Sequence, residues 1–174
     1  MKLIMFAIMM AALAGISSDA FAQSVGEKAA SALGMTPSAE SFVKTAAISN
    51  MFEIESSKLA QERTSGKQRG FATKMVSDHS KTTAELKAIA VQSKLEVPSA
   101  MDSSHQSKLD KLKGLKGEEF NKQYPAEQVA AHKDAVSLFE RYAKGGDNKA
   151  LKGFAAKYLP HLKQHLQLAE KLPK

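Results

Sequence analysis

The sequence predicts an all-α protein, an antiparallel four-helix bundle with a crossover segment that contains a short helix. Four long stretches repeat apolar or small residues at the three- and four-residue spacing of helices. Runs that alternate apolar and polar residues are nearly absent, and Ala, Lys, Leu, Glu and Gln dominate the chain. Two short breaks and one longer connection separate the stretches. Two hairpins joined by a crossover are the arrangement of ferritin-like folds.

The first predicted hairpin covers residues 38–95. Ser38 can cap a helix that runs to about Arg63, and after a break at residues 64–66 a second helix runs to about Leu95, before Pro98. The expected inward stripe of the first helix contains Phe42, Ala46, Ser49, Glu53, Ser56 and Ala60. That of the second contains Phe71, Met75, Thr82, Leu86 and Ile89.

The crossover, residues 98–117, leads into the second hairpin. Residues 101–115 carry leucines at helical spacing and predict the short helix, and a long helix follows from about Glu118 to Lys144. Its expected inward stripe contains Phe120, Tyr124, Val129, His132, Val136 and Phe139. The Gly145–Gly146 pair stops this helix, and Asp147 is the expected cap of the last one.

The last predicted helix runs to about Lys171. Its expected inward stripe contains Leu151, Ala155, Tyr158, Leu162, His165 and Ala169. Pro160 lies within the pattern and predicts a kink or a break near Lys157.

Residues 1–22 resemble a cleavable signal peptide. Lys2 precedes an apolar run, and Ala20–Phe21–Ala22 is a small-x-small cleavage site. We therefore expect cleavage after Ala22 and export to the periplasm, with residues 23–37 as a flexible lead-in and residues 38–171 as one bundle domain. After the signal, no apolar run approaches the roughly 20 residues of a membrane span.

The net charge of +7 does not indicate nucleic-acid binding, because only three of the 25 basic residues are Arg and aromatics are not interleaved with the lysines. A lysine cluster at positions 108, 111, 113 and 116 is either a solvated face or a weak contact with anionic envelope components. The absence of Cys excludes disulfides, thiolate metal sites and Cys nucleophiles.

Ionisable residues on the apolar stripes are the best site candidates, because burial of such groups is costly unless they are paired or bind a metal. Glu53 and His79 lie within about 3 Å of the same level in the first hairpin, at 1.5 Å per residue. In the second hairpin His161 matches the level of His132, while His165 lies roughly 6–9 Å further along. Glu53, His79, His132 and His165, with His161 as a further option, could bind iron, copper or zinc.

A buried hydrogen-bonded network without metal is the alternative interpretation of the same residues. No His has Glu three positions before it, which disfavours a ferritin-type diiron centre. Phosphate-binding loops, nucleophile elbows and zinc-protease helices are also absent from the sequence. Nothing in the sequence therefore favours an enzyme.

The chain resembles a bacterial family of exported helical-bundle proteins, the "domain of unknown function 4142" family, over residues 38–170. The matching segments are Phe42, 46–47, 50–55, 59–60, 71–72, 75–79, 117–120, Tyr124, His132, 138–139, Leu151, 154–155, 159–160 and His165. The resemblance implies a ferritin-like bundle and the motif positions Glu53, Asp78, His79, Tyr124, His132 and His165. His161 is not in the pattern, and Asn121 stands where the family usually has Asp.

These observations lead to three hypotheses. The first is an exported, non-catalytic binding or stress-related protein. The second is a metal-binding protein with redox or storage activity at the Glu and His residues. The third is a cell-envelope adaptor that uses the segment 108–116.

Overall fold

The computed structural model describes residues 34–173, and the predicted signal segment lies outside this range. Five helices and no strand occur in the described part, which confirms the all-α prediction. The helices are α2 (Ala39–Arg63), α3 (Gly66–Gln92), α4 (Ser103–Gly114), α5 (Gly117–Gly145) and α6 (Lys149–Glu170).

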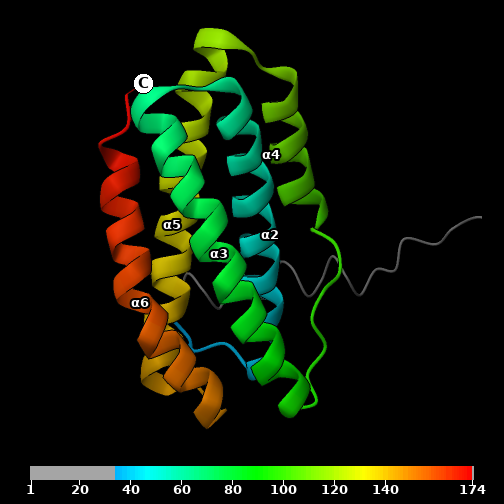
Figure 1. Cartoon of the computed structure of the whole chain (residues 1–174). Coiled ribbons are helices and arrows are strands. Elements are labelled where there is room, and N and C mark those ends of the chain that lie inside the picture. Colours follow the sequence, from blue (N-terminus) through cyan, green and yellow to red (C-terminus); the bar gives the residue numbers. More distant parts are fainter. Residues whose placement is uncertain (1–33, 174) are drawn as a thin grey trace, which may run out of the picture.

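The four long helices form a bundle of two hairpins, as predicted from the breaks between the stripes. Helix α2 packs on α3 and α5 on α6, while α2 also contacts α5 and α3 contacts α6. Each of these neighbouring pairs is antiparallel, and the crossover with α4 returns along the length of the bundle (Figure 1). Helix α4 lies on the outside against α2. None of the described helices is long and apolar enough to cross a membrane.

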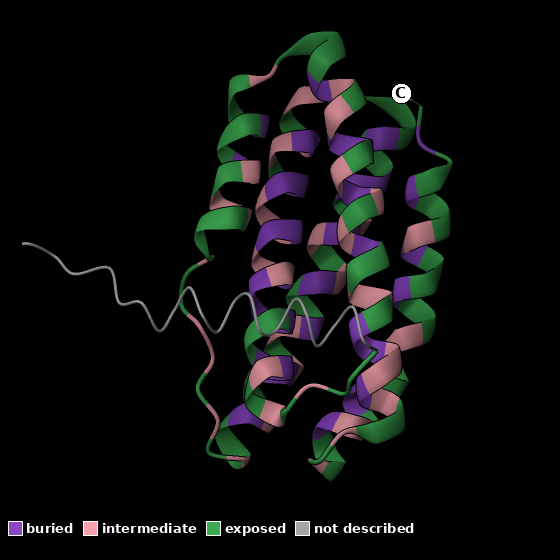
Figure 2. Cartoon of the chain, turned by 180° about the vertical axis from the view of Figure 1, so that it is seen from behind, coloured by how far each residue is buried: buried purple, intermediate pink, exposed green. Residues whose placement is uncertain are grey.

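The core has two apolar clusters, one toward each end of the bundle. One contains Phe42, Phe139, Tyr142 and Phe154, and the other contains Phe52, Met75, Phe120 and Tyr124. The buried residues follow the inward faces of the helices (Figure 2). On α3, α5 and α6, one buried histidine lies between the segments that supply the two clusters. A polar layer therefore separates the two apolar clusters.

Local hydrogen bonds of the backbone and of a capping side chain set the start of α2 and the end of α3. Ser38 caps α2 by accepting a hydrogen bond from the Ser41 amide at 3.2 Å, as predicted. Helix α3 ends at Gln92, slightly before the predicted Leu95. Lys94 takes a left-handed conformation with φ 56°, and the Leu95 amide donates to the carbonyl of Ala90 at 2.9 Å. This closing turn ends the helix before Pro98 can influence it.

One prediction for α6 was wrong in detail. Asn148, not Asp147, caps the helix, and its side chain accepts from the amides of Ala150 and Leu151. Asp147 is engaged elsewhere, because its carboxylate accepts from the hydroxyl of Tyr142 at 2.8 Å. The prediction near Lys157 was a kink or a break, and the break does not occur, because the helix continues through Pro160. Pro160 is exposed, so the carbonyl that it leaves without an intrahelical partner is near solvent.

The inward face of α5 is rotated slightly from the predicted stripe. Val129 and Val136 are only half-buried, and their expected places are taken by Gln128, Leu138 and Tyr142. The sequence pattern favoured the β-branched residues because they are apolar. Gln128 is nevertheless fully buried, which indicates a polar partner in the core.

Candidate metal centre

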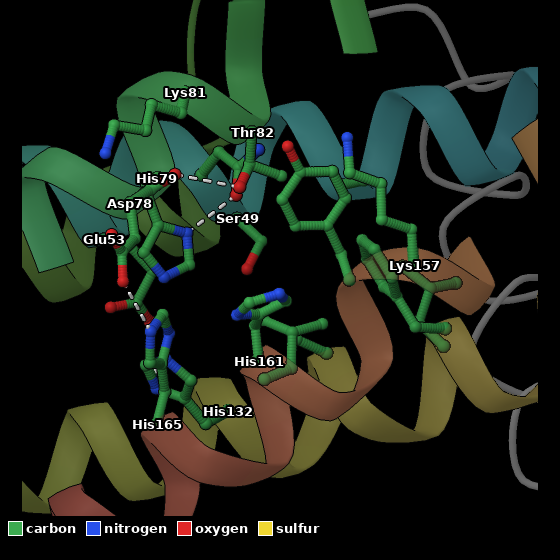
Figure 3. Close-up of a pocket in the computed structure, with 17 residues that line it drawn as sticks. Ser49, Glu53, Asp78, His79, Lys81, Thr82, His132, Lys157, His161 and His165 are labelled. Carbon is green, nitrogen blue, oxygen red and sulfur yellow. Dashed lines mark hydrogen bonds and ion pairs between the residues drawn. The ribbon is translucent and has the colours of Figure 1, made fainter. Parts of the chain in front are cut away.

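Three histidines from three helices meet in the polar layer. His79 of α3, His132 of α5 and His165 of α6 each offer one ring nitrogen, and these atoms all lie within 4.8 Å of one another. The ring centroids are 5.5 to 5.6 Å apart in each pair. All three side chains are nearly inaccessible to solvent, with exposed fractions of 4%, 1% and 3%. Figure 3 shows the rings converging beside a pocket.

The second nitrogen of each ring is fixed by an acceptor. Nδ1 of His79 lies 2.8 Å from the side-chain oxygen of Asn50, and Nδ1 of His132 lies 2.8 Å from the backbone carbonyl of Gln128. Nε2 of His165 lies 3.0 Å from a carboxylate oxygen of Asp78. These oxygens accept hydrogen bonds, so each ring donates its N–H outward from the cluster.

The remaining nitrogens therefore carry lone pairs that face one another. They are Nε2 of His79, Nε2 of His132 and Nδ1 of His165, and none has a hydrogen-bond partner in the structure. Three buried acceptors without a donor are unfavourable in a protein core. A cation bound by the three nitrogens would satisfy all of them at once.

Burial keeps the cluster neutral. Desolvation is the main cause that lowers the pKa of each ring: to about 4 for His132, and well below the usual range for His79. The pKa of His165 is also lowered by burial, although the Asp78 carboxylate opposes the shift. Neutral imidazole is the form that binds a metal, so the histidines need not lose protons at pH 7.

The structure groups His165, rather than His161, with His132. His161 is exposed and lies four residues earlier on α6, where its ring contacts Tyr158. The sequence favoured His161 as the partner of His132, because the two Cα positions are at the same level along the helix axes. Side chains, however, lean toward the N-terminus of their own helix. In antiparallel helices they lean in opposite directions. The ring of His165 therefore reaches back toward the α5–α6 turn, while that of His132 reaches away from it.

Glu53 lies beside the three histidines but outside their lone-pair cluster. Nδ1 of His132, which faces away from the cluster, lies 3.8 Å from a Glu53 oxygen. That separation is too long for a hydrogen bond. The structure thus brings together three of the four expected ligands, and Glu53 occupies a neighbouring position.

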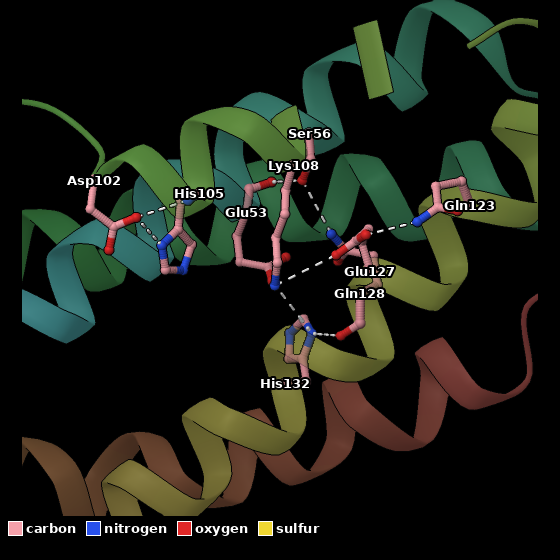
Figure 4. A network of polar contacts seen from close by, with 9 residues as sticks. All are labelled: Glu53, Ser56, Asp102, His105, Lys108, Gln123, Glu127, Gln128 and His132. Carbon is pink, nitrogen blue, oxygen red and sulfur yellow. Dashed lines mark hydrogen bonds and ion pairs between the residues drawn. The ribbon is translucent and has the colours of Figure 1, made fainter. Parts of the chain in front are cut away.

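The surroundings of Glu53 hold its carboxyl in the protonated form. The side chain is 1% exposed, and burial raises the pKa of Glu53 to about 8. The nearby Gln128 amide and Lys108 oppose the rise, although neither carboxyl oxygen has a partner within hydrogen-bonding distance. Gln128 donates instead to the hydroxyl of Ser56 at 3.2 Å (Figure 4). At neutral pH this carboxyl adds no negative charge to the polar layer.

The other two motif positions have different places. Asp78 supports His165 and also pairs with Lys74 at 2.8 Å. Burial would raise the pKa of Asp78, but these two partners outweigh it and keep the pKa low. Tyr124 lies in the apolar cluster near α4, where its hydroxyl is 2.9 Å from that of Ser57. It lies within α5, on the predicted inward stripe of that helix.

Sequence reasoning missed Asn50 and Gln128 as partners of the site. Each is a buried amide on an inward stripe, with exposed fractions of 5% and 0%. Their spacing was the available signal, because Gln128 precedes His132 by one helical turn and Asn50 precedes Glu53 similarly. In a sequence, polar residues at positions of an apolar stripe indicate a buried polar network.

The lysine cluster at 108–116 lies on α4 and just after it. Lys108 faces Glu127 at 3.7 Å and Lys113 pairs with Asp110 at 3.1 Å. Nearby carboxylates thus neutralise part of its charge.

Comparison with protein-family models gives one family, described as "Domain of unknown function (DUF4142)", which matches residues 24–172. Neither the curated proteins nor the solved structures gave a match. The family match covers all five described helices, including the three that carry the histidines. The chain belongs to the DUF4142 family, in agreement with the resemblance that its stripe residues carry.

Proposed function

We propose that this protein binds one divalent transition-metal ion through His79, His132 and His165. The observation that carries the proposal is the convergence of three buried ring nitrogens, each without a hydrogen-bond partner. Metal-binding histidines usually donate their other ring N–H to a carboxylate, carbonyl or similar acceptor, which orients the ring. Asn50, Gln128 and Asp78 supply those acceptors here.

The spacing of the nitrogens supports a metal of the first transition row. Tetrahedral bonds of about 2.0–2.1 Å place ligand nitrogens roughly 3.4 Å apart. The separations of at most 4.8 Å therefore need to shorten by about 1.4 Å or less. Small side-chain rotations suffice for a change of this size. Imidazole-only donor sets suit zinc, copper and iron, with copper(II) bound most tightly and iron(II) more weakly than zinc.

Metal titration of the mature protein, made without a histidine tag, tests the proposal. After removal of metal by a chelator, we expect one zinc ion per chain in a competition titration. Each of His79→Ala, His132→Ala and His165→Ala should weaken zinc binding by more than the roughly 10- to 100-fold that loss of an outer partner costs. His161→Ala is the matched control, because this exposed histidine lies on the same helix as His165 but outside the cluster.

Far-ultraviolet circular dichroism of each variant would establish that the bundle is retained. Equal zinc affinity in folded wild-type protein and in the three cluster variants would contradict the proposal. So would a wild-type protein that takes up no zinc or copper. A buried polar network would then be the remaining interpretation of the histidines.

We also propose that the protein works in the periplasm. The support is the signal-like segment of residues 1–22, with its small-x-small site at Ala20–Phe21–Ala22. Cell fractionation and N-terminal sequencing test this location independently of metal binding. A mature protein that begins at Gln23 in the periplasmic fraction is the expected result, and an intact N-terminus in the cytoplasm would contradict it.

A further inference from the structure

A pocket of about 260 Å³ lies against the histidine cluster. His79, His132 and His165 all line it, and so do the exposed residues Lys81 and His161. The pocket thus extends from the three histidine side chains to exposed residues (Figure 3). A cavity for one water needs only about 10–15 Å³, so the space holds far more than a single solvent molecule.

Three protein ligands leave room in the coordination sphere of a bound ion. Zinc sites with three protein ligands keep a fourth position for water or another small molecule. No further residue in the described chain joins the cluster of three nitrogens. The pocket is the space from which an external ligand reaches that position.

The charge around the pocket favours an anionic ligand. Imidazole binds a metal ion as a neutral ligand, so three imidazoles leave a divalent ion with its full charge. Lys81 and Lys157 line the pocket, and Lys157 is paired with Glu85 at 2.6 Å. Of the carboxylates near the histidines, Asp78 is paired with Lys74 at 2.8 Å, and Glu53 lies outside the cluster of ring nitrogens.

Apolar side chains form much of the pocket wall. Leu138, Phe139 and Leu162 line it and are themselves 3 to 6% exposed. A small inorganic anion would leave this wall unused, whereas a hydrocarbon body would remove apolar surface from water. Ligand pockets commonly combine such walls with a few polar groups that fix orientation.

We propose that the pocket binds a small organic carboxylate, with its carboxylate on the metal ion and its hydrocarbon body against Leu138, Phe139 and Leu162. This inference depends on the metal site proposed above. Lys81 contributes attraction for the anion at the pocket entrance.

Cobalt(II) loaded into the metal-free protein provides a direct test, because its visible absorption reports changes in coordination. Benzoate, acetate, phosphate and benzyl alcohol are added separately to the cobalt protein. We expect benzoate to change the spectrum saturably and to bind at least about tenfold more tightly than acetate, because its ring buries additional apolar surface. Benzyl alcohol, which has the ring without the charge, should leave the spectrum unchanged.

Two variants separate the contributions of charge and apolar contact. Lys81→Ala should weaken benzoate and acetate binding by a similar factor of a few, while Lys87→Ala, an exposed lysine of α3 outside the pocket, serves as the matched control. Leu162→Ala should reduce the preference for benzoate over acetate. If Leu162→Ala does not fold, the ratio of the two affinities in wild-type protein still tests the apolar wall.

The outcomes distinguish this inference from the proposed function. Failure of cobalt and zinc to bind would refute the metal site itself. Stoichiometric cobalt with a spectrum that no anion alters would overturn only the ligand inference. Equal affinities for benzoate and acetate, or tighter binding of phosphate, would also overturn it, because the pocket would then act as a simple anion site.

Discussion

Replacement of Glu53 by Gln should stabilise the metal-free protein, by an amount that grows with pH. Burial raises the pKa of the Glu53 carboxyl from 4.5 to about 8. Between these values the unfolded chain releases a proton that the folded protein retains, so the stability of wild-type protein falls as pH rises. Below pH 4.5 both states are protonated and this cost is absent. The amide of Gln has a similar shape and does not titrate.

The size of the effect follows from the shift. Each pKa unit corresponds to about 1.4 kcal/mol, so moving the pKa from 4.5 to 8 costs the folded state about 5 kcal/mol once the pH exceeds 8. At pH 7 the cost is about 3 kcal/mol. The free energy of unfolding of Glu53→Gln relative to wild type should therefore rise by about 1.4 kcal/mol per pH unit from pH 5 to pH 8. Above pH 8 the difference should level off.

Urea denaturation followed by circular dichroism, at pH 5 to 9 with chelator present, measures this difference. The histidines titrate in both proteins, so their contribution cancels. Glu62→Gln, at an exposed position of the same helix, is the matched control for loss of a carboxyl group outside the core. A pH-independent difference for Glu53→Gln would refute the reasoning, because it would mean that Glu53 is already ionised in the folded protein.

Three further substitutions test the polar layer and the packing around it. Asn50→Ala removes the acceptor for Nδ1 of His79 and should weaken zinc binding roughly 10- to 100-fold in a chelator competition; unchanged affinity would contradict its role. Arg63→Ala removes hydrogen bonds of 2.8–3.0 Å to three carbonyls at the end of α4, and urea denaturation should show a loss of about 2–3 kcal/mol. Phe42→Ala leaves a cavity in the apolar cluster that contains Phe139 and Tyr142, and should lower the free energy of unfolding by about 3–5 kcal/mol in the same assay. A loss below about 1 kcal/mol would mean that the neighbouring side chains fill the cavity.

The repeating spacing of apolar residues was sufficient to predict the bundle. Side chains three and four positions apart share a helix face, so the stripes identified the inward faces and the breaks identified the hairpins. The same spacing placed Glu53, His79, His132 and His165 on or beside the inward stripes, where burial of ionisable groups indicates a polar layer. The residue that caps α6 was harder to predict, because Asp147 and Asn148 both have side chains suited to an N-cap. The hydrogen bond between Asp147 and Tyr142 engages Asp147 and leaves Asn148 as the cap.

The sequence by itself determined the fold class, the hairpins and the histidines that lie on buried faces, because these depend on periodicity within each helix. Only the tertiary structure decided that His165 joins His79 and His132, that Glu53 stands aside, and which nitrogen of each ring faces its neighbours. Those features depend on the stagger of one helix against another and on the acceptors that neighbouring helices bring to each ring. No spacing along a single chain specifies them, since side-chain direction and axial offset are fixed only when the helices pack.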